Sequence, residues 1–200
     1  MLTEIVFDIE TQNSFSQVNN DFRLLKVSVI SIYSPQTKKF QSFTENEIGQ
    51  LWPIFEKADL LIGYNSEHFD LPILNNYYPG NLLEFPHLDL MKEVQKSIGR
   101  RIKLNDLAVA TLDNVAKSAD GLQAIKWYQE GKIDEIKKYC EQDVNITWQI
   151  YDFGLKHRQL FYKTLTGETL PFAVDFSLPN NESLIKGDSN QKSINLTLPL

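Results

Sequence analysis

Near the start of the chain stands Glu4-Ile5-Val6-Phe7-Asp8-Ile9-Glu10, a short apolar run with β-branched residues that ends in two acids. This composition predicts a β-strand. Successive side chains of a strand point to opposite faces of the sheet, so Asp8 and Glu10, two residues apart, project from the same face. The strand therefore presents two carboxylates side by side.

The segments around this strand predict further strands separated by helices. Leu24 to Tyr33 and Lys39 to Phe43 predict an antiparallel hairpin, because the turn sequence Ser34-Pro35-Gln36-Thr37 separates them. Leu60 to Tyr64 predicts another buried strand, and His87 to Leu90 predicts a short one. These strands supply the sheet of the predicted fold.

Helical signals lie between and after the strands. Thr44-x-x-Glu47 fits a capping box, and we expect Pro53 to kink or split the helix that it begins. Asp70-Leu71-Pro72 opens a second helix, with proline in its first turn. The longest helix is expected over about Ile133 to Leu155. The whole order predicts an α/β fold with a mixed β-sheet flanked by α-helices.

The chain divides into one domain and a tail. We expect residues 1–165 to form the domain and residues 166–200 to form a polar, partly flexible C-terminal tail, with residues 177–193 the most flexible. Leu170 to Phe176 could add an edge strand, and the alternating Ile194-Asn195-Leu196-Thr197-Leu198 could dock on a partner as a strand. The segment from Lys117 to Gly121 predicts a break between helices.

Composition excludes several classes of protein. Of 200 residues, 42% are hydrophobic and 23% are charged, which excludes wholesale disorder. No apolar stretch approaches the ~18 to 20 residues that span a bilayer, and the N-terminus does not resemble a secretory signal. The single cysteine, Cys140, excludes an intramolecular disulfide and a multi-cysteine zinc site. We expect a cytoplasmic protein without membrane association.

The charge distribution leaves two interpretations open. The net charge of −6 disfavours a protein that grips duplex nucleic acid by charge alone. Ten of the 20 Lys and Arg residues nevertheless lie between Lys92 and Lys138. They could form solvated helix faces or a surface that contacts phosphates.

Four acids and a tyrosine stand on three of the predicted elements. Asp8 and Glu10 share a strand, and Asp70 lies at a junction between a strand and a helix. Tyr139 and Asp143 are four residues apart on a helix, which places them on one face. Each piece alone is explained by a solvated strand end, a helix N-cap or an amphipathic helix, so the prediction depends on their joint occurrence.

This combination suits phosphodiester hydrolysis. The reaction passes through a highly anionic transition state and needs an activated water. Two divalent ions ~3.5 to 4 Å apart can serve both needs. Mg²⁺ and Mn²⁺ prefer hard oxygen ligands, so carboxylates held on rigid elements are suitable residues.

These segments resemble the three exonuclease motifs of the DEDD superfamily, tyrosine subclass. The matching segments are Phe7-Asp8-Ile9-Glu10-Thr11, Gly63-Tyr64-Asn65 through Phe69-Asp70, and Tyr139 through Asp143. Members are 3′→5′ exonucleases with a ribonuclease H-like fold. The second motif is closest in style to the proofreading domains of family B DNA polymerases and their stand-alone or helicase-associated relatives. The resemblance covers about residues 1–155.

The subclass follows from one position. The histidine subclass would place a histidine at position 138, which is Lys138 here, and Tyr139 occupies the position of the tyrosine subclass. None of the three histidines falls where the family would need one, so we expect each to be a surface or packing residue. They are His68, His87 and His157.

The resemblance implies a role for each matching residue. Asp8 would bridge two metals, and Glu10 and Asp143 would complete the site of the metal that activates water. Asp70 would hold the second ion, through water, near the leaving 3′ oxygen. Tyr139 would orient the attacking water, because a phenol with a pKa near ~10 is a poor base at neutral pH.

Other residues are candidates for substrate contact or support. Asn65 could hydrogen-bond near the terminal nucleotide, and Phe69 or Phe15 could stack on the terminal bases. Arg100, Arg101 and Lys103 form a cluster of which any member could meet the strand backbone. Asp89 is expected to have a turn or support role, and Cys140 to be a small buried residue.

The sequence therefore predicts a metal-dependent 3′→5′ exonuclease that uses Mg²⁺ or Mn²⁺ and releases nucleoside 5′-monophosphates from single-stranded ends. DNA is preferred over RNA from the style of the second motif. The alternatives are an RNA 3′-end trimming enzyme with the same residues, and a catalytically silent module that binds other proteins. A replication or repair protein could bind through the C-terminal tail.

Overall fold

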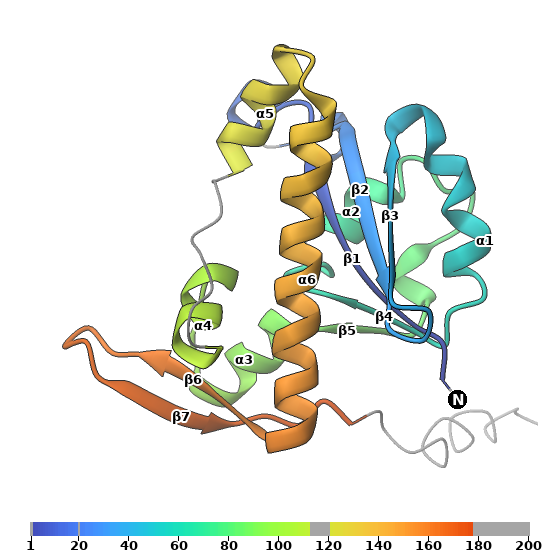
Figure 1. Ribbon diagram of the computed structural model, residues 1–200. Coiled ribbons are helices and arrows are strands. Elements are labelled where there is room, and N and C mark those ends of the chain that lie inside the picture. Colours follow the sequence, from blue (N-terminus) through green and yellow to red (C-terminus); the bar gives the residue numbers. More distant parts are fainter. Residues whose placement is uncertain (1, 20, 113–120, 178–200) are drawn as a thin grey trace, which may run out of the picture.

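The computed structural model describes residues 2–19, 21–112 and 121–177. At its centre is a five-stranded mixed sheet with the order β3-β2-β1-β4-β5 (Figure 1). The strands are β1 (Glu4–Thr11), β2 (Val27–Ser34), β3 (Lys39–Thr44), β4 (Leu60–Gly63) and β5 (His87–Asp89). β1 is antiparallel to β2 and parallel to β4. The predicted mixed α/β fold is confirmed.

Helices cover both faces of this sheet (Figure 1). They are α1 (Trp52–Phe55), α2 (Asp70–Leu74), α3 (Leu90–Ile98), α4 (Leu104–Thr111), α5 (Gly121–Gln129) and α6 (Ile133–His157). Phe7 of β1 packs in one core cluster with Phe55 of α1 and Leu71 of α2. Val6, the preceding residue, packs in the other cluster with Val144 of α6. Successive side chains of β1 therefore point into the two core clusters on opposite faces of the sheet.

The capping box and the proline after β3 act where the sequence predicts them. The capping box is present, since the backbone N–H of Thr44 donates to Glu47 Oε2 over 2.9 Å. It begins a 3₁₀ helix over Glu45–Gln50, and α1 begins only at Trp52, with Pro53 in its first turn. The proline therefore separates two short helices, because it cannot donate a hydrogen bond inside a continuous one.

The start of β2 is a correction. The strand expected from Leu24 begins at Val27, because Phe22–Leu24 forms a 3₁₀ turn. The side chain of Asp21 caps this turn by accepting a hydrogen bond from the backbone N–H of Arg23. Such local capping competes with the strand that the apolar pattern favours.

The chain after α6 forms a hairpin of its own. β6 (Gln159–Lys163) pairs with β7 (Thr169–Ala173) in a separate two-stranded sheet. The edge strand expected over Leu170 to Phe176 therefore joins the segment just before it in the chain, and not the main sheet. Phe172 of the hairpin and Phe176 beyond it are buried in the core cluster that includes α6.

Several predictions concern the C-terminal part of the chain and the segment around residue 117. The boundary predicted after residue 165 lies in the turn between β6 and β7. Three of the predictions lie mostly or wholly outside the described residues. They are the flexible segment at 177–193, the docking strand at 194–198 and the helix break at 117–121. None of the helices in the described ranges combines the length and the apolar character needed to cross a bilayer.

Candidate metal centre

Strand β1 directs two carboxylates toward helix α6. Val6 faces the layer that contains α6, and side chains two residues apart in a strand share a face. Asp8 and Glu10 therefore extend from the same side of β1 as Val6. Beside them, the buried thiol of Cys140 on α6 donates to the backbone oxygen of Asp8 over 3.2 Å. The helix thus lies directly against the acidic end of the strand.

Three of the predicted acids come together at this contact. One carboxylate oxygen from each of Asp8, Glu10 and Asp143 lies within 4.8 Å of the other two. Asp143 is one helical turn from Tyr139 and Cys140 on α6, so the helix brings a residue 133 positions beyond Glu10 to the strand. The arrangement offers hard oxygen ligands from two rigid elements.

Asp70 joins the group from the opposite layer. It is the first residue of α2 and its side chain is buried, with 3% of the residue exposed. Its Oδ1 accepts a hydrogen bond of 3.2 Å from the backbone N–H of Ile9, the residue between Asp8 and Glu10. This contact fixes the Asp70 carboxylate against the same stretch of β1.

The electrostatics of the group favour a bound cation. Burial, and then the charges of Asp70, Glu10 and Asp143, raise the pKa of Asp8 well above its usual range. Burial, and then the charges of Asp143 and Asp70, do the same to the pKa of Glu10. Burial raises the pKa of Asp70 to about 7. Ionised carboxylates packed so closely repel one another, and a divalent cation among them would remove that cost. The donor set therefore fits a metal ion.

Tyr139 lies beside this acidic group. Its side chain is hydrogen-bonded to Asp143, and its ring packs edge-on against Trp127 with centroids 6.1 Å apart. Burial and the neighbouring carboxylates raise the pKa of Tyr139 above its usual value. The phenol therefore stays protonated at neutral pH and can act as a hydrogen-bond donor, but not as a base.

Cys140 has the buried position that the sequence predicts. Its thiol also approaches Asp8 Oδ2 over 3.6 Å. Burial and the charges of Asp8 and Glu10 raise the pKa of this thiol well above its usual value. A protonated thiol is a poor nucleophile, so its position suits packing and weak hydrogen bonding to Asp8.

An apolar pocket of ≈ 430 Å³ adjoins the acidic group. Glu10 lines it together with Phe15 and Phe69, whose ring centroids are 5.6 Å apart. Leu122 and Ile125 of α5 line it as well. The structure therefore places both predicted stacking residues next to a predicted metal ligand.

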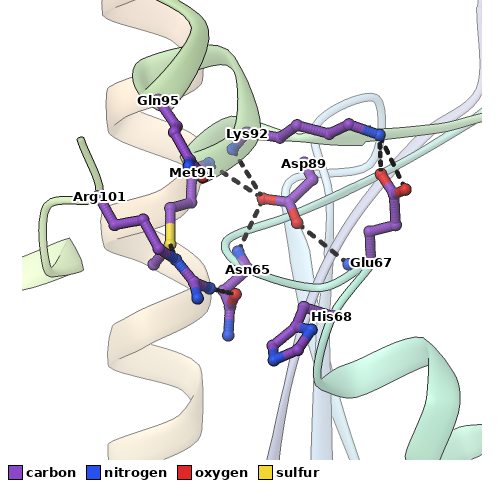
Figure 2. A pocket seen from close by; sticks show the side chains of 8 residues that line it. All are labelled: Asn65, Glu67, His68, Asp89, Met91, Lys92, Gln95 and Arg101. Atoms are coloured by element: carbon purple, nitrogen blue, oxygen red, sulfur yellow. Dashed lines mark hydrogen bonds and ion pairs between the residues drawn. The ribbon is translucent and has the colours of Figure 1, made fainter. Parts of the chain in front are cut away.

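Asn65 lies in a different pocket. Its backbone is left-handed, with φ of 65°, and its side chain lines a pocket of ≈ 260 Å³ with Arg101 and Met91 (Figure 2). The Arg101 guanidinium donates to Asn65 Oδ1. The structure thus brings Asp8, Glu10, Asp70, Tyr139 and Asp143 into one group, but directs Asn65 to a neighbouring cavity.

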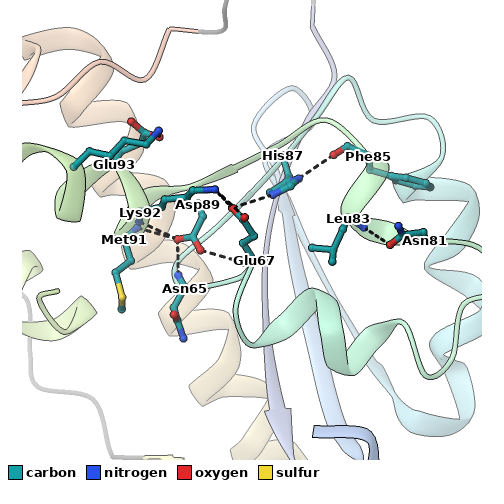
Figure 3. A network of polar contacts seen from close by, with 11 residues as sticks. Asn65, Glu67, Asn81, Leu83, Phe85, His87, Asp89, Met91, Lys92 and Glu93 are labelled. Carbon is teal, nitrogen blue, oxygen red and sulfur yellow. Dashed lines mark hydrogen bonds and ion pairs between the residues drawn. The ribbon is translucent and has the colours of Figure 1, made fainter. Parts of the chain in front are cut away.

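Asp89 supports the turn that carries Asn65 and Asp70. Its carboxylate accepts from the backbone N–H groups of Asn65 over 2.8 Å and of Glu67 over 3.1 Å (Figure 3). It also caps α3 by accepting from Met91 N over 3.0 Å and Lys92 N over 3.4 Å. The position before a helix gives a local signal for the cap, but the two bonds to the turn depend on the fold and have no local signal.

The histidines have the packing or surface roles that we expect for them. His68 is exposed and packs edge-on against Phe22. His87 Nδ1 lies 3.0 Å from the backbone oxygen of Phe85, and His157 packs against the ring of Phe153. None of them belongs to the group of carboxylates that could hold a metal among the described residues.

Comparisons with known proteins agree with this fold. The family model described as the RNase_H superfamily matches residues 5–153, so the chain belongs to the ribonuclease H superfamily. No curated protein matches the chain significantly by sequence. The family B DNA polymerase from the hyperthermophilic archaeon Pyrobaculum calidifontis has a similar structure, with a TM-score of 0.60 and 18% sequence identity. The match covers 78% of this chain and 25% of the polymerase chain.

These findings confirm the predicted ribonuclease H-like fold. The polymerase also belongs to the family whose proofreading domains the second motif resembles in sequence. At this identity the structural likeness concerns the fold, and this chain corresponds to a quarter of that polymerase.

Proposed function

We propose that this protein is a metal-dependent 3′→5′ exonuclease of the tyrosine subclass, which releases nucleoside 5′-monophosphates from single-stranded ends and prefers DNA. The observation that carries the proposal is the convergence of Asp8, Glu10 and Asp143, with carboxylate oxygens within 4.8 Å of one another. Asp70 is hydrogen-bonded to the same stretch of β1. Residues from three segments of sequence thereby form one small acidic site.

The carboxylates would hold the metal ions. Asp8, Glu10 and Asp143 would hold one divalent cation, and Asp8 and Asp70 would hold a second. Bound Mg²⁺ or Mn²⁺ supplies positive charge for the anionic transition state and lowers the pKa of water. The protein contributes the spacing of the ligands, since β1 and α6 are fixed by the core on both sides of the sheet.

Tyr139 orients the attacking water. Its raised pKa keeps the hydroxyl proton in place, and its contact with Asp143 directs the phenol toward the metal ligands. With its proton donated to Asp143 in a hydrogen bond, the phenol oxygen can accept a hydrogen bond from the water and position it without removing its proton. The proton therefore leaves to solvent or to a carboxylate of the site.

The pocket beside Glu10 accommodates the terminal base. Phe15 and Phe69 offer aromatic surface next to the acidic group, and stacking on such surface is tolerant of sequence. A base held there places the last phosphodiester beside the carboxylates. A duplex end would have to fray before its terminal base could enter, which supports a single-stranded substrate.

The proposal is tested with 5′-labelled oligonucleotides of matched DNA and RNA sequence, incubated with Mn²⁺ or Mg²⁺. We expect a ladder that shortens from the 3′ end, faster on DNA, and no reaction on a strand with a blocked 3′ end. A faster reaction on RNA would favour the trimming enzyme. Cleavage that ignores the block would indicate an endonuclease and contradict the proposal.

Two variants on α6 distinguish the loss of a metal ligand from a general effect on the helix. Asp143→Asn should abolish the ladder, whereas Asp152→Asn should retain it, because Asp152 on the same helix forms an exposed ion pair with Lys156. Wild-type turnover by Asp143→Asn would refute the assigned site. A folded wild-type protein with no activity under any of these conditions would favour the silent binding module.

A further inference from the structure

The pocket beside Asn65 contains the Arg101 guanidinium, which forms no ion pair with a carboxylate among the described residues. Arg101 is exposed and lines the pocket of ≈ 260 Å³ with Asn65, Met91, Lys92 and others (Figure 2). Its partners are the Asn65 amide oxygen and, from Nε over 2.9 Å, the sulfur of Met91. Both are neutral, and a thioether is a weak acceptor.

The other charges around the pocket are already satisfied. Asp89 accepts four backbone N–H groups, and its carboxylate is buried with 6% of the residue exposed. The Glu67 carboxylate is paired with the Lys92 ammonium over 2.6 Å and lies 3.6 Å from His87 Nε2. In Figure 2 the Lys92 ammonium points toward Glu67 and away from Arg101. Arg101 is therefore the cation in this part of the structure that remains available to a ligand.

The pocket borders the acidic site through a short turn. Residues 64–69 connect β4 to α2, with Asn65 near the start of the connection and the proposed metal ligand Asp70 directly after its end. His68 of this turn lines the pocket, while Phe69 lines the apolar pocket beside Glu10. A strand that reaches the carboxylates can thus pass the Arg101 side chain on the far side of the turn.

We propose that Arg101 binds a backbone phosphate of the single strand other than the phosphate that is cleaved. This inference rests on the proposed function and specifies how its substrate is held. Guanidinium offers five N–H donors, of which the pocket uses two, and its fork matches two phosphate oxygens. A phosphate there would replace the weak sulfur contact with charge-assisted hydrogen bonds. The positive charge of Arg101 would also offset part of the repulsion between the polyanionic strand and the acidic group.

The two neighbouring arginines give a matched comparison. Arg100 lies over the ring of Tyr162 at 5.1 Å and donates to the backbone oxygen of Lys163. Arg100→Gln therefore removes the same charge one position away, from a side chain directed to the β6–β7 hairpin. Arg101→Gln removes the proposed phosphate contact. Both positions are exposed, and thermal unfolding of each variant checks that the fold is kept.

The test measures the dissociation constant of a 5′-fluorescein single strand by anisotropy in EDTA, and KM and kcat with Mn²⁺. Arg101→Gln should raise the dissociation constant and KM by about tenfold or more, with a smaller change in kcat. The slope of log K against log salt should fall by about 0.7, which corresponds to the loss of one phosphate contact on a single strand. Arg100→Gln should resemble the wild type.

A second arm locates the phosphate without relying on a variant. Oligonucleotides carry one neutral methylphosphonate at successive linkages from the 3′ end, excluding the one that is cleaved. We expect one linkage at which neutralisation weakens binding to the wild type but has no further effect on Arg101→Gln. Equal loss at every linkage, or an unchanged profile in Arg101→Gln, would overturn the assignment.

The outcomes separate this inference from the proposed function. If the wild type cleaves but Arg101→Gln behaves like Arg100→Gln, the exonuclease stands and the phosphate site is wrong. If the wild type binds the strand in the predicted manner but never cleaves, the phosphate site stands and the catalytic proposal is wrong. A wild type that neither binds nor cleaves contradicts both.

Discussion

In the proposed reaction, Tyr139 takes part without acting as a base. Its hydroxyl is hydrogen-bonded to Asp143, and the surrounding carboxylates hold its proton in place. Tyr139→Phe removes the donor but keeps the ring that packs on Trp127. We expect kcat to fall about 10- to 100-fold with little change in KM, because a poorly oriented water reacts more slowly.

Steady-state kinetics on a labelled single strand measure this effect. A base role would make Tyr139→Phe as inactive as Asp143→Asn and would shift the alkaline limb of the pH profile. Wild-type kinetics for Tyr139→Phe would mean that the phenol has no part in the reaction. A partial loss of kcat with an unshifted pH profile is the outcome that the orientation role requires.

Individual residues also mark the limit of sequence analysis at the site. The four acids and Tyr139 could be named in advance because they occur together in three motifs that resemble those of the DEDD exonucleases. The spacings of two and four only place Asp8 with Glu10, and Tyr139 with Asp143, on a shared face. The orientation of Asn65 could not be predicted, because it depends on a left-handed backbone and on a guanidinium 36 positions later in the chain. Such a contact has no local pattern.

At the scale of the elements, Asp89 joins β5, α3 and the turn before α2. It accepts hydrogen bonds from two backbone N–H groups of the turn and two of the helix (Figure 3). Asp89→Ala should lower the free energy of unfolding by about 2–4 kcal/mol, because it removes an N-cap and leaves four partly buried N–H groups without their acceptor. Chemical denaturation measures this change.

Two other variants control for this effect. Asp89→Asn keeps one oxygen but turns an N–H toward Glu67 N. We therefore expect its free energy of unfolding to lie between those of the wild type and Asp89→Ala. Asp21→Ala removes the cap of a short exposed turn and should cost less than about 1 kcal/mol. Equal losses for Asp89→Ala and Asp21→Ala would contradict the role of Asp89 in joining these elements.

The elements themselves were predictable to different degrees. The strands and α6 follow from apolar runs and long helical periodicity, and α6 begins at the predicted Ile133. The hairpin of β6 and β7 was not foreseen as a separate sheet, since the apolar pattern of residues 170–176 does not specify its partner. Partner choice depends on the short connection from β6, which brings the two strands together in an antiparallel pair.

For the molecule as a whole, the acidic site lowers stability when no metal is bound. Asp70 has a pKa of about 7 in the folded state, far above the value of about 4 expected in an unfolded chain. The folded protein therefore binds more protons than the unfolded chain across this interval, so its stability falls as pH rises through it. The raised pKa values of Asp8 and Glu10 act in the same direction.

We expect the unfolding temperature in EDTA to fall between about pH 4 and pH 7. Mn²⁺ should raise it most at the upper end of this range, where the carboxylates are ionised. Asp70→Asn should raise the metal-free unfolding temperature at neutral pH and flatten the pH dependence. Scanning calorimetry measures these trends, and a metal-free stability that increases with pH would contradict the electrostatics of the site.

The proposed function requires that carboxylates from β1 and α6 share a divalent metal. Calorimetric titration of Mn²⁺ into the wild type, Asp8→Asn, Asp143→Asn and Asp152→Asn tests it most directly. We predict that Asp8→Asn and Asp143→Asn each weaken Mn²⁺ binding about tenfold or more, while the surface variant Asp152→Asn binds like the wild type. Unchanged Mn²⁺ affinity in both site variants would show that these carboxylates do not bind the metal.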